Sequence, residues 1–179
     1  MTLDTSYGEL RQIAYVVADI ESAMTHWSSV LGVGPWFYNE HVGITEFRYR
    51  GKPSALPDVS IALANSGGLQ VELIQQRDTA PSLYQDFLRR NGEGAQHVAF
   101  WTLEFDAMAG RLQAAGYVEG QAGRIGQRGR FAYYVHGDLP GNVVELSEQT
   151  GGKAEFFRQV AQAAVGWDGR DPIRKIVRK

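Results

Sequence analysis

The sequence Gln12-Ile-Ala-Tyr-Val-Val-Ala-Asp19 occurs a second time, in similar form, as His97-Val-Ala-Phe-Trp-Thr-Leu-Glu104. Each stretch is rich in β-branched and aromatic residues, which indicates a strand, and each ends on an acidic residue that can begin a helix. After both stretches, apolar residues recur at the three- and four-residue spacing of one helix face. The two stretches therefore predict two copies of a strand followed by a helix.

A second pair of similar segments follows the first pair in the same order. Val71-Glu72-Leu73 matches Val144-Glu145-Leu146, and both segments have the character of a strand. The spacing between the copies is shorter for this pair because the first copy has a longer middle loop. Two matched pairs in one order indicate duplication of a β-α-β-β-β unit.

The remaining pattern divides the chain into one duplicated domain and a C-terminal extension. Predicted strands cover residues 11–18, 45–50, 59–64, 69–75, 96–102, 117–120, 130–136 and 142–147, and predicted helices cover 20–31, 82–90, 105–115 and 155–164. We expect a single α+β domain over 10–150, made of module one (10–77), a linker helix segment (78–95) and module two (96–150). Residues 151–179 are predicted to form a C-terminal helix and tail.

The composition excludes several classes of protein. The chain has 179 residues, with 18 Lys and Arg, 20 Asp and Glu, and no cysteine. This nearly balanced charge argues against a nucleic-acid-binding protein. The lack of cysteine excludes disulfides, thiolate zinc sites, iron–sulfur clusters and a cysteine nucleophile. Apolar runs are too short to cross a membrane and the polar N-terminus does not resemble a signal peptide, so we expect a cytoplasmic protein.

Strand alternation predicts four metal-capable side chains on one face of the sheet. The apolar face of each first strand should pack under its helix, so Gln12 and His97 project from the opposite face. Glu72 and Glu145, on the closing strands, project from that same helix-free face. This face also carries the apolar residues Val16, Ile74, Trp101 and Val143. A glutamate on a strand is commonly solvated and a lone histidine commonly belongs to a core, but symmetric pairs of such groups on a partly apolar face indicate a pocket.

These segments resemble the vicinal oxygen chelate superfamily, also called the glyoxalase/bleomycin-resistance/dioxygenase fold. The resemblance covers residues 10–148 and is carried by residues 12–19, 71–74, 96–100 and 143–146. Within the superfamily the chain is most similar to the methylmalonyl-CoA epimerase-like branch, through residues 82–97, 131–136 and 141–145. The resemblance implies a cupped mixed sheet, formed by two tandem βαβββ modules around a central metal or substrate pocket.

The resemblance also implies a divalent metal ion, held by the first and last strand of each module. The residues at those positions in this chain are Gln12, Glu72, His97 and Glu145. The branch normally has a histidine where this chain has Gln12. An amide oxygen can still bind a hard cation, so the expected ion is Mg²⁺, Mn²⁺, Co²⁺ or Zn²⁺, while weaker metal binding or none stays open.

The chemistry implied by the resemblance is proton transfer next to a carbonyl. A metal ion acts as a Lewis acid on the carbonyl, and glutamates beside it can move a proton at the adjacent carbon. We therefore expect an isomerase, epimerase or lyase acting on a small molecule with a carbonyl or thioester, with Glu145 and Glu72 as catalytic residues. The family also leads us to expect a homodimer. Expected substrate contacts are Trp101, Arg130, Tyr134 and His136, with Arg124 and Arg128 as further candidates for binding a phosphate or carboxylate.

Two other functions fit the same fold. A metal-free small-molecule binding protein of the antibiotic-resistance type is an alternative, because Gln12 departs from the usual ligand set and aromatic residues could line such a pocket. A ring-cleaving iron dioxygenase needs two histidines and one carboxylate as ligands. Only His97 supplies a histidine at the ligand positions, so this third function ranks last.

Overall fold

The two predicted copies form the two halves of one mixed sheet. The computed structural model describes residues 7–176. The first half contains β1 (Leu10–Val16), α1 (Ile20–Ser29), β2 (Trp36–Asn39), β5 (Val59–Ser66) and β6 (Leu69–Gln76). The second half contains β7 (Gly94–Thr102), α3 (Phe105–Ala114), β8 (Tyr117–Ile125), β9 (Arg130–His136) and β10 (Leu139–Glu148). The other elements are β3 (Ile44–Tyr49), β4 (Lys52–Pro53), α2 (Leu83–Asn91), α4 (Lys153–Ala164) and β11 (Ile173–Lys175).

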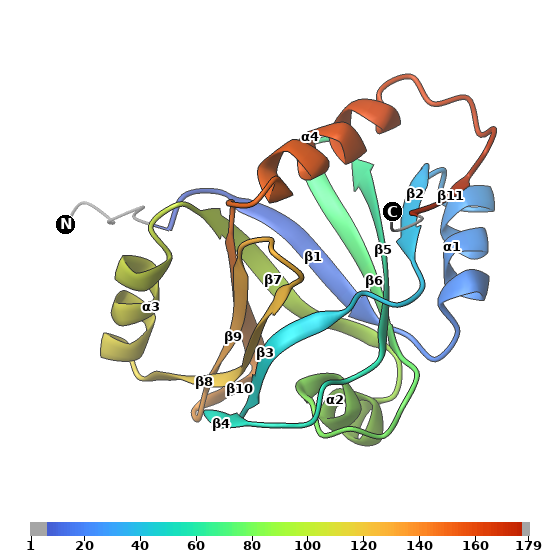
Figure 1. The fold of residues 1–179 in the computed structure, drawn as a ribbon. Coiled ribbons are helices and arrows are strands. Elements are labelled where there is room, and N and C mark those ends of the chain that lie inside the picture. The colour runs from blue at the N-terminus through green and yellow to red at the C-terminus, as the bar shows by residue number, and fades with distance from the viewer. Residues whose placement is uncertain (1–6, 177–179) are drawn as a thin grey trace.

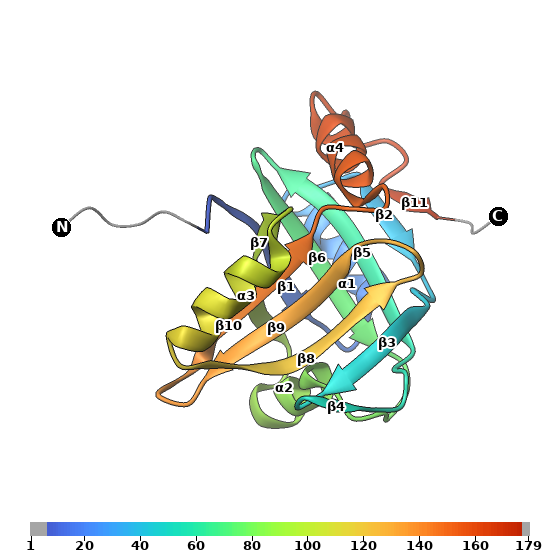
Figure 2. The same ribbon diagram turned by 60° about the vertical axis from the view of Figure 1, so that its left-hand side comes forward.

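The order of the strands confirms the duplication. The sheet runs β11-β2-β5-β6-β1-β7-β10-β9-β8-β3-β4. At its centre β1 and β7 pair antiparallel, and each has the closing strand of its own half, β6 or β10, parallel on its other side. The order β2-β5-β6-β1 in the first half thus corresponds to β8-β9-β10-β7 in the second. The sheet curls into the deep cup seen in Figure 2, as the prediction of a cupped α+β fold requires.

One hairpin of the first half leaves its own half. The strand expected at 45–50 is present as β3, but it pairs with β8 at the far edge of the second half. The edge of β5 is paired instead with β2, a strand that the sequence pattern does not predict. The residues of β2 directly follow Gly34-Pro35 and have the sequence pattern of a loop. They form a strand because they pair with β5. The two short strands β4 and β11 are also absent from the sequence-based prediction.

The four helices within residues 7–176 lie on both sides of the sheet (Figure 1). Helices α1 and α3 cover its outer face, while α2 and α4 lie at opposite ends of the concave side. Tyr84 of α2 packs in one cluster with Ala14, and Phe157 of α4 packs in another with Leu63. The middle of the concave face is left for a pocket. None of these helices has the length and apolar character needed to cross a membrane.

Helix α4 begins two residues before its predicted start, at Lys153. Gly152 precedes it with φ of 81°, a conformation that glycine adopts without steric cost. The Lys153 side chain is buried, with 4% of the residue exposed. Its Nζ donates hydrogen bonds to the backbone oxygen of Arg130, at 3.1 Å, and to Ser147 Oγ, at 3.2 Å. These contacts join the start of α4 to β9 and β10.

Arg130 links β9 to β10 and to the start of α3. Its guanidinium lies 2.9 Å from Glu148 Oε1 and 2.7 Å from Asp106 Oδ1, and it covers the ring of Phe105 at 4.2 Å. The hydrogen bonds from Arg130 hold the pKa of Glu148 well below its usual 4.5, at about 2. Glu148 is mostly buried, so this interaction is screened less than a surface ion pair.

We predict that Arg130→Leu lowers the free energy of unfolding by about 2 kcal/mol at pH 7 and by less at pH 3. Because the folded-state pKa of Glu148 is depressed, its contribution is complete above its ordinary pKa of 4.5 and disappears as the pH falls toward 2. Urea denaturation of both proteins at the two pH values measures the difference. Arg170→Leu is the control, since Arg170 contacts Asp168 with 89% of its side chain exposed. An equal loss for Arg130→Leu at both pH values would contradict this interpretation.

Candidate functional site

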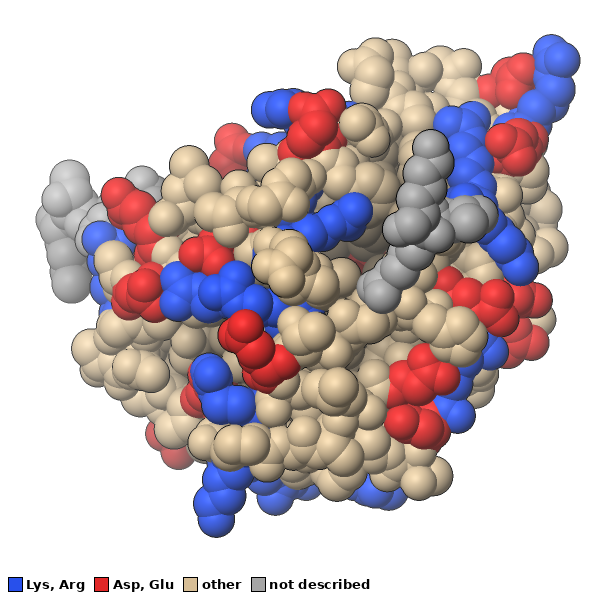
Figure 3. All heavy atoms as spheres, in the orientation of Figure 1, with Lys and Arg blue, Asp and Glu red and all other residues tan. Residues whose placement is uncertain are grey.

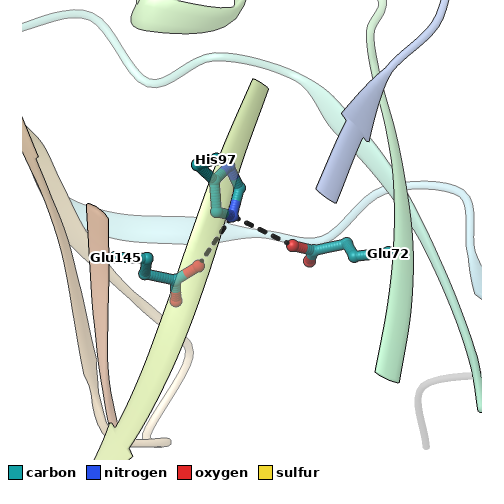
Figure 4. Close-up of side chains that lie close together, drawn as sticks. All are labelled: Glu72, His97 and Glu145. Carbon is teal, nitrogen blue, oxygen red and sulfur yellow. Dashed lines mark hydrogen bonds and ion pairs between the residues drawn. The ribbon is translucent and has the colours of Figure 1, made fainter. Parts of the chain in front are cut away.

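Two carboxylates and one imidazole meet on the concave face of the sheet. Glu72 comes from β6, His97 from β7 and Glu145 from β10, and all three are buried. His97 Nε2 lies 2.9 Å from Glu145 Oε2 and 3.5 Å from Glu72 Oε2. Figure 4 shows the two carboxylates approaching the imidazole from opposite sides. We call these three residues the Glu-His-Glu cluster.

The register of the strands explains why these side chains meet. On β1, Ala14 is paired with Glu72 on one side and with His97 on the other. On β7, Ala99 is paired with Glu145. Both alanines are fully buried and have the smallest side chain that keeps strand geometry. The longer side chains of their neighbours therefore have room to converge above them.

Neighbouring residues fix the orientation of His97. Its Nδ1 lies 2.6 Å from Gln96 Oε1, which has only acceptor lone pairs, so Nδ1 carries the proton and donates it. The ring also stacks on Tyr133, with centroids 4.4 Å apart. Nε2 is thus directed at the two carboxylates. A metal-ligating histidine is commonly held in this way by a hydrogen bond at its other nitrogen.

The charges of the Glu-His-Glu cluster are poorly compensated. Burial, together with repulsion from Glu145, raises the pKa of Glu72 above its usual 4.5. Burial alone would lower the pKa of His97, but hydrogen bonds to Glu145 and Glu72 outweigh it and raise that pKa to about 9. Glu72 Oε2 is buried, and among residues 7–176 its contact with His97 Nε2, at 3.5 Å, is long for a hydrogen bond. One imidazolium therefore faces two carboxylates.

Gln12 lies in the same pocket as the two carboxylates. It is 2% exposed, and its Nε2 donates a hydrogen bond to Gln70 Oε1 at 2.7 Å. This bond uses the amide nitrogen, so the amide oxygen is the atom that Gln12 can offer to a cation. Gln12 therefore remains a proposed fourth ligand of the metal ion.

The pocket around these residues is mostly apolar. Its walls include Phe37, Ile61, Leu63, Phe131 and Phe156, from β2, β5, β9 and α4. Its polar groups, besides Gln12 and the two glutamates, include the hydroxyls of Tyr84 and Tyr133, which lie 2.8 Å apart, and the cations Arg128 and Lys153. Figure 3 shows this side of the molecule hollowed below α4, with Lys or Arg atoms at the edge of the hollow.

The donor set of the cluster fits a divalent metal ion. One ligand atom from each of Glu72, His97 and Glu145 lies within 4.8 Å of the others. Ligand atoms bound at about 2.1 Å in octahedral or tetrahedral geometry are separated by about 3.0–3.4 Å. The distances of 2.9 and 3.5 Å from His97 Nε2 to the two carboxylates agree with that spacing. A cation would also give Glu72 Oε2, which has only the long contact with His97, a ligand bond.

The four predicted substrate contacts lie elsewhere. Trp101 packs on Phe157 with ring centroids 4.6 Å apart, and Arg130 is held by its two ion pairs. Tyr134 is buried against α3 on the outer face, and His136 stacks on Tyr117. None of the four is among the described residues that line the pocket of Glu72 and Glu145. Their role in substrate binding stays a prediction that this geometry does not favour.

The alternation of side chains along β9 explains why Tyr134 and His136 do not line the pocket. Tyr134 and His136 share the face that packs under α3, whereas Phe131 and Tyr133 point into the cup. Tyr133 is also the register partner of Glu145, so cross-strand pairing would have identified it once the strands were aligned. Among the arginines suggested for anion binding, Arg124 pairs with Glu46 at 3.1 Å, while Arg128 does line the pocket. Sequence reasoning also missed Gln96, Tyr84 and Lys153.

Comparison with known proteins supports the sequence resemblance. The family model of the glyoxalase/bleomycin resistance protein/dioxygenase superfamily matches residues 11–134. No curated protein matches the chain.

Solved structures share the fold at low sequence identity. The methylmalonyl-CoA epimerase from Mycobacterium tuberculosis matches with a TM-score of 0.60 and 20% identity, covering 87% of this chain and 97% of that one. A hypothetical protein from Bacillus halodurans matches with a TM-score of 0.56 and 17% identity, covering 79% and 94%. A variant of the Streptomyces coelicolor methylmalonyl-CoA epimerase in complex with 2-nitronate-propionyl-CoA has a TM-score of 0.50 and 16% identity, covering 79% and 97%. At these identities the likeness shows the fold.

We predict that Glu72→Gln raises the stability of the metal-free protein by about 1 kcal/mol. The change removes one of two buried like charges and leaves the closer Glu145–His97 pair intact. Thermal unfolding in the presence of a chelator measures the effect. Glu145→Gln is the matched control and should not stabilise, because it removes the shorter hydrogen bond to His97. A melting temperature of Glu72→Gln below that of the unmodified protein would show that Glu72 is not electrostatically strained.

Proposed function

Because the chain belongs to the glyoxalase/bleomycin resistance protein/dioxygenase superfamily, we propose that it is a metal-dependent isomerase, epimerase or lyase that moves a proton next to a carbonyl or thioester. The observation that carries the proposal is the Glu-His-Glu cluster, which converges from both halves of the sheet and whose two glutamates line an apolar pocket. In this proposal Glu72, His97 and Glu145, with the amide oxygen of Gln12, hold the ion. A bound Mg²⁺, Mn²⁺, Co²⁺ or Zn²⁺ would stabilise the negative charge that develops on the substrate oxygen.

The two glutamates supply the proton transfer. Glu145 takes the proton from the carbon beside the carbonyl, and Glu72 is its counterpart on the opposite side of His97. Two carboxylates on opposite sides of one site suit an epimerisation, in which a proton leaves one face of a carbon and returns to the other. The pKa of Glu72 is already raised by burial, which favours its acting as an acid near neutral pH.

The tyrosine pair can support the substrate oxygen. Burial raises the pKa values of Tyr84 and Tyr133 well above 10, so both hydroxyls keep their protons at neutral pH. They share one hydrogen bond of 2.8 Å, which leaves one hydroxyl proton for another acceptor. A hydroxyl donor beside a developing enolate oxygen stabilises it most where water is excluded. The apolar walls of the pocket provide that exclusion.

The solved neighbours indicate which substrates to test first. Two of them are methylmalonyl-CoA epimerases, and one is bound to an acyl-CoA analogue. Acyl-CoA thioesters with an acidic carbon–hydrogen bond are therefore the first class, and α-hydroxyketones of the glyoxalase type are the second. The protein is proposed to act on small molecules, without nucleic acid or membrane, in the cytoplasm and as a homodimer.

Metal-free binding of a small molecule is the second candidate function. It is favoured by the hydrogen bond that ties Gln12 to Gln70 and by the aromatic and aliphatic walls. In this case the protein would sequester an apolar compound and catalyse nothing.

A metal titration separates the two candidates. We predict that the protein binds one Mn²⁺ per chain and that His97→Ala and Glu145→Ala each weaken binding at least about 100-fold, because each removes a ligand. Gln96→Leu should weaken binding about 10-fold or more, since it removes the acceptor that fixes His97. Electron paramagnetic resonance of free Mn²⁺ gives the affinities. Binding that is unchanged in His97→Ala would place the ion elsewhere, and no binding of any of the four ions would favour the metal-free function.

Solvent exchange tests the chemistry directly. We predict that the Mn²⁺-loaded protein incorporates deuterium from ²H₂O into at least one acyl-CoA or α-hydroxyketone, and that Glu145→Gln slows this about 10²–10⁴-fold. Mass spectrometry of the recovered compound measures the incorporation. Glu40→Gln is the control, because it removes a carboxylate outside the pocket lining. Absence of exchange across both compound classes would count against proton transfer as the function.

A further inference from the structure

Two cations line the same pocket as the two glutamates of the Glu-His-Glu cluster. Lys153, the first residue of α4, is 4% exposed, and Arg128 lies in the loop between β8 and β9. Both line the pocket with Glu72 and Glu145. Lys153 and its helix α4 lie beyond residue 134, where the family match ends. The superfamily assignment therefore gives Lys153 no role.

Neither cation forms an ion pair with a carboxylate of the described residues. Among the described residues, no carboxylate oxygen lies within 4.0 Å of Lys153 Nζ or the Arg128 guanidinium. Lys153 donates to two neutral oxygens, of Arg130 and Ser147, which leaves one of its three N–H groups for another acceptor. The Arg128 guanidinium rests on the ring of Phe156 at 4.8 Å.

Placing these two cations in the pocket raises the free energy of the folded protein as long as no anion is bound. Burial, and to a smaller extent the charge of Arg128, lower the pKa of Lys153 to about 8 against the attraction of Glu145, Glu72 and Glu148. A cation in the first turn of a helix is also opposed by the helix dipole. Lys153 still carries its proton at neutral pH, so a buried positive charge beside a second one faces the pocket. An anion between them would relieve both costs.

We propose that Lys153 and Arg128 form a subsite for a carboxylate of the substrate, whose carbonyl lies at the Glu-His-Glu cluster. The position of the carbonyl rests on the function proposed above, whereas the subsite itself rests only on the two cations. A carboxylate has two oxygens, one for the remaining N–H of Lys153 and one for the guanidinium of Arg128. A singly charged carboxylate also loses less hydration energy in an apolar pocket than a doubly charged phosphate does.

The spacing along β10 limits the size of the substrate. Ser147, which accepts the Lys153 hydrogen bond, is two residues from Glu145 on the same face of the strand. Side chains so placed stand about 7 Å apart. The inferred substrate is therefore a short oxo acid, or an acyl group with a free carboxylate, in which a few carbon atoms separate the anion from the carbonyl.

A matched pair of probes tests the subsite. Isothermal titration calorimetry at pH 7 compares 4-oxopentanoate with the neutral 4-oxopentanamide, using the full chain once with Mn²⁺ and once with a chelator. We expect the carboxylate to bind about 10-fold more tightly than the amide in both conditions, because only the carboxylate contacts the two cations. Lys153→Met should abolish this preference, Lys153→Arg should keep it within about 3-fold, and Arg128→Gln should reduce it by about half or more. Lys52→Met, which removes an exposed lysine outside the pocket lining, is the control for total charge.

The possible results test the Lys153–Arg128 subsite independently of the proposed metal-dependent function. A preference that Lys153→Met and Arg128→Gln both leave unchanged overturns the subsite, even if the metal binds as proposed. Tighter binding of n-butyl phosphate than of 4-oxopentanoate overturns the choice of a carboxylate. If Lys153→Met does not fold by circular dichroism, Arg128→Gln decides, because Arg128 lies in a loop and its side chain rests on Phe156. A preference lost in both variants of a protein that binds no metal would support the subsite and reject the metal-dependent function.

Discussion

The burial of two carboxylates beside one imidazole is the electrostatic constraint on which the rest of this structure depends. Glu72 and Glu145 are removed from water, and His97 provides a single positive charge between them. Buried ionised groups cost free energy unless they are paired or bind a cation. Replacing buried ion pairs by apolar residues of similar volume is often neutral or stabilising, so stability alone does not account for both glutamates. Two such groups in a pocket with apolar walls indicate that the cost is offset by a function in binding or chemistry.

The duplication explains where this cluster lies and why its halves differ. Each copy contributes a closing strand with one glutamate, β6 with Glu72 and β10 with Glu145, and the copies meet where β1 pairs with β7. The first strands carry different side chains at the matching position, Gln12 in one copy and His97 in the other. The backbone is therefore symmetric while the chemistry is not. Gln12 has also acquired a buried partner of its own, Gln70.

Much of the fold and part of the site could be predicted from periodicity alone. Alternation along short strands placed Gln12, Glu72, His97 and Glu145 on one face, and the structure brings the last three within 4.8 Å of one another. Alternation gives two faces but does not say which one is concave, so Tyr134 was preferred over its neighbour Tyr133, which stacks on His97. The pairing of β3 with β8 and of β11 with β2 depends on contacts between distant segments, which local pattern does not contain. Lys153 was missed for the same reason, because only the docking of α4 buries it.

The β3–β4 hairpin ties the two ancestral copies together. It departs from the first copy after β2 and forms the edge of the second copy beside β8. Without the second copy β3 would pair only with the two-residue strand β4, and without the first copy the edge of β8 would be open to pairing with other molecules. The backbone pairing of β3 with β8 therefore ties each half of the sheet to the other. Separating the two halves would leave β3 with only its short partner β4 and would expose the edge of β8, so each half shields the other from pairing with foreign strands.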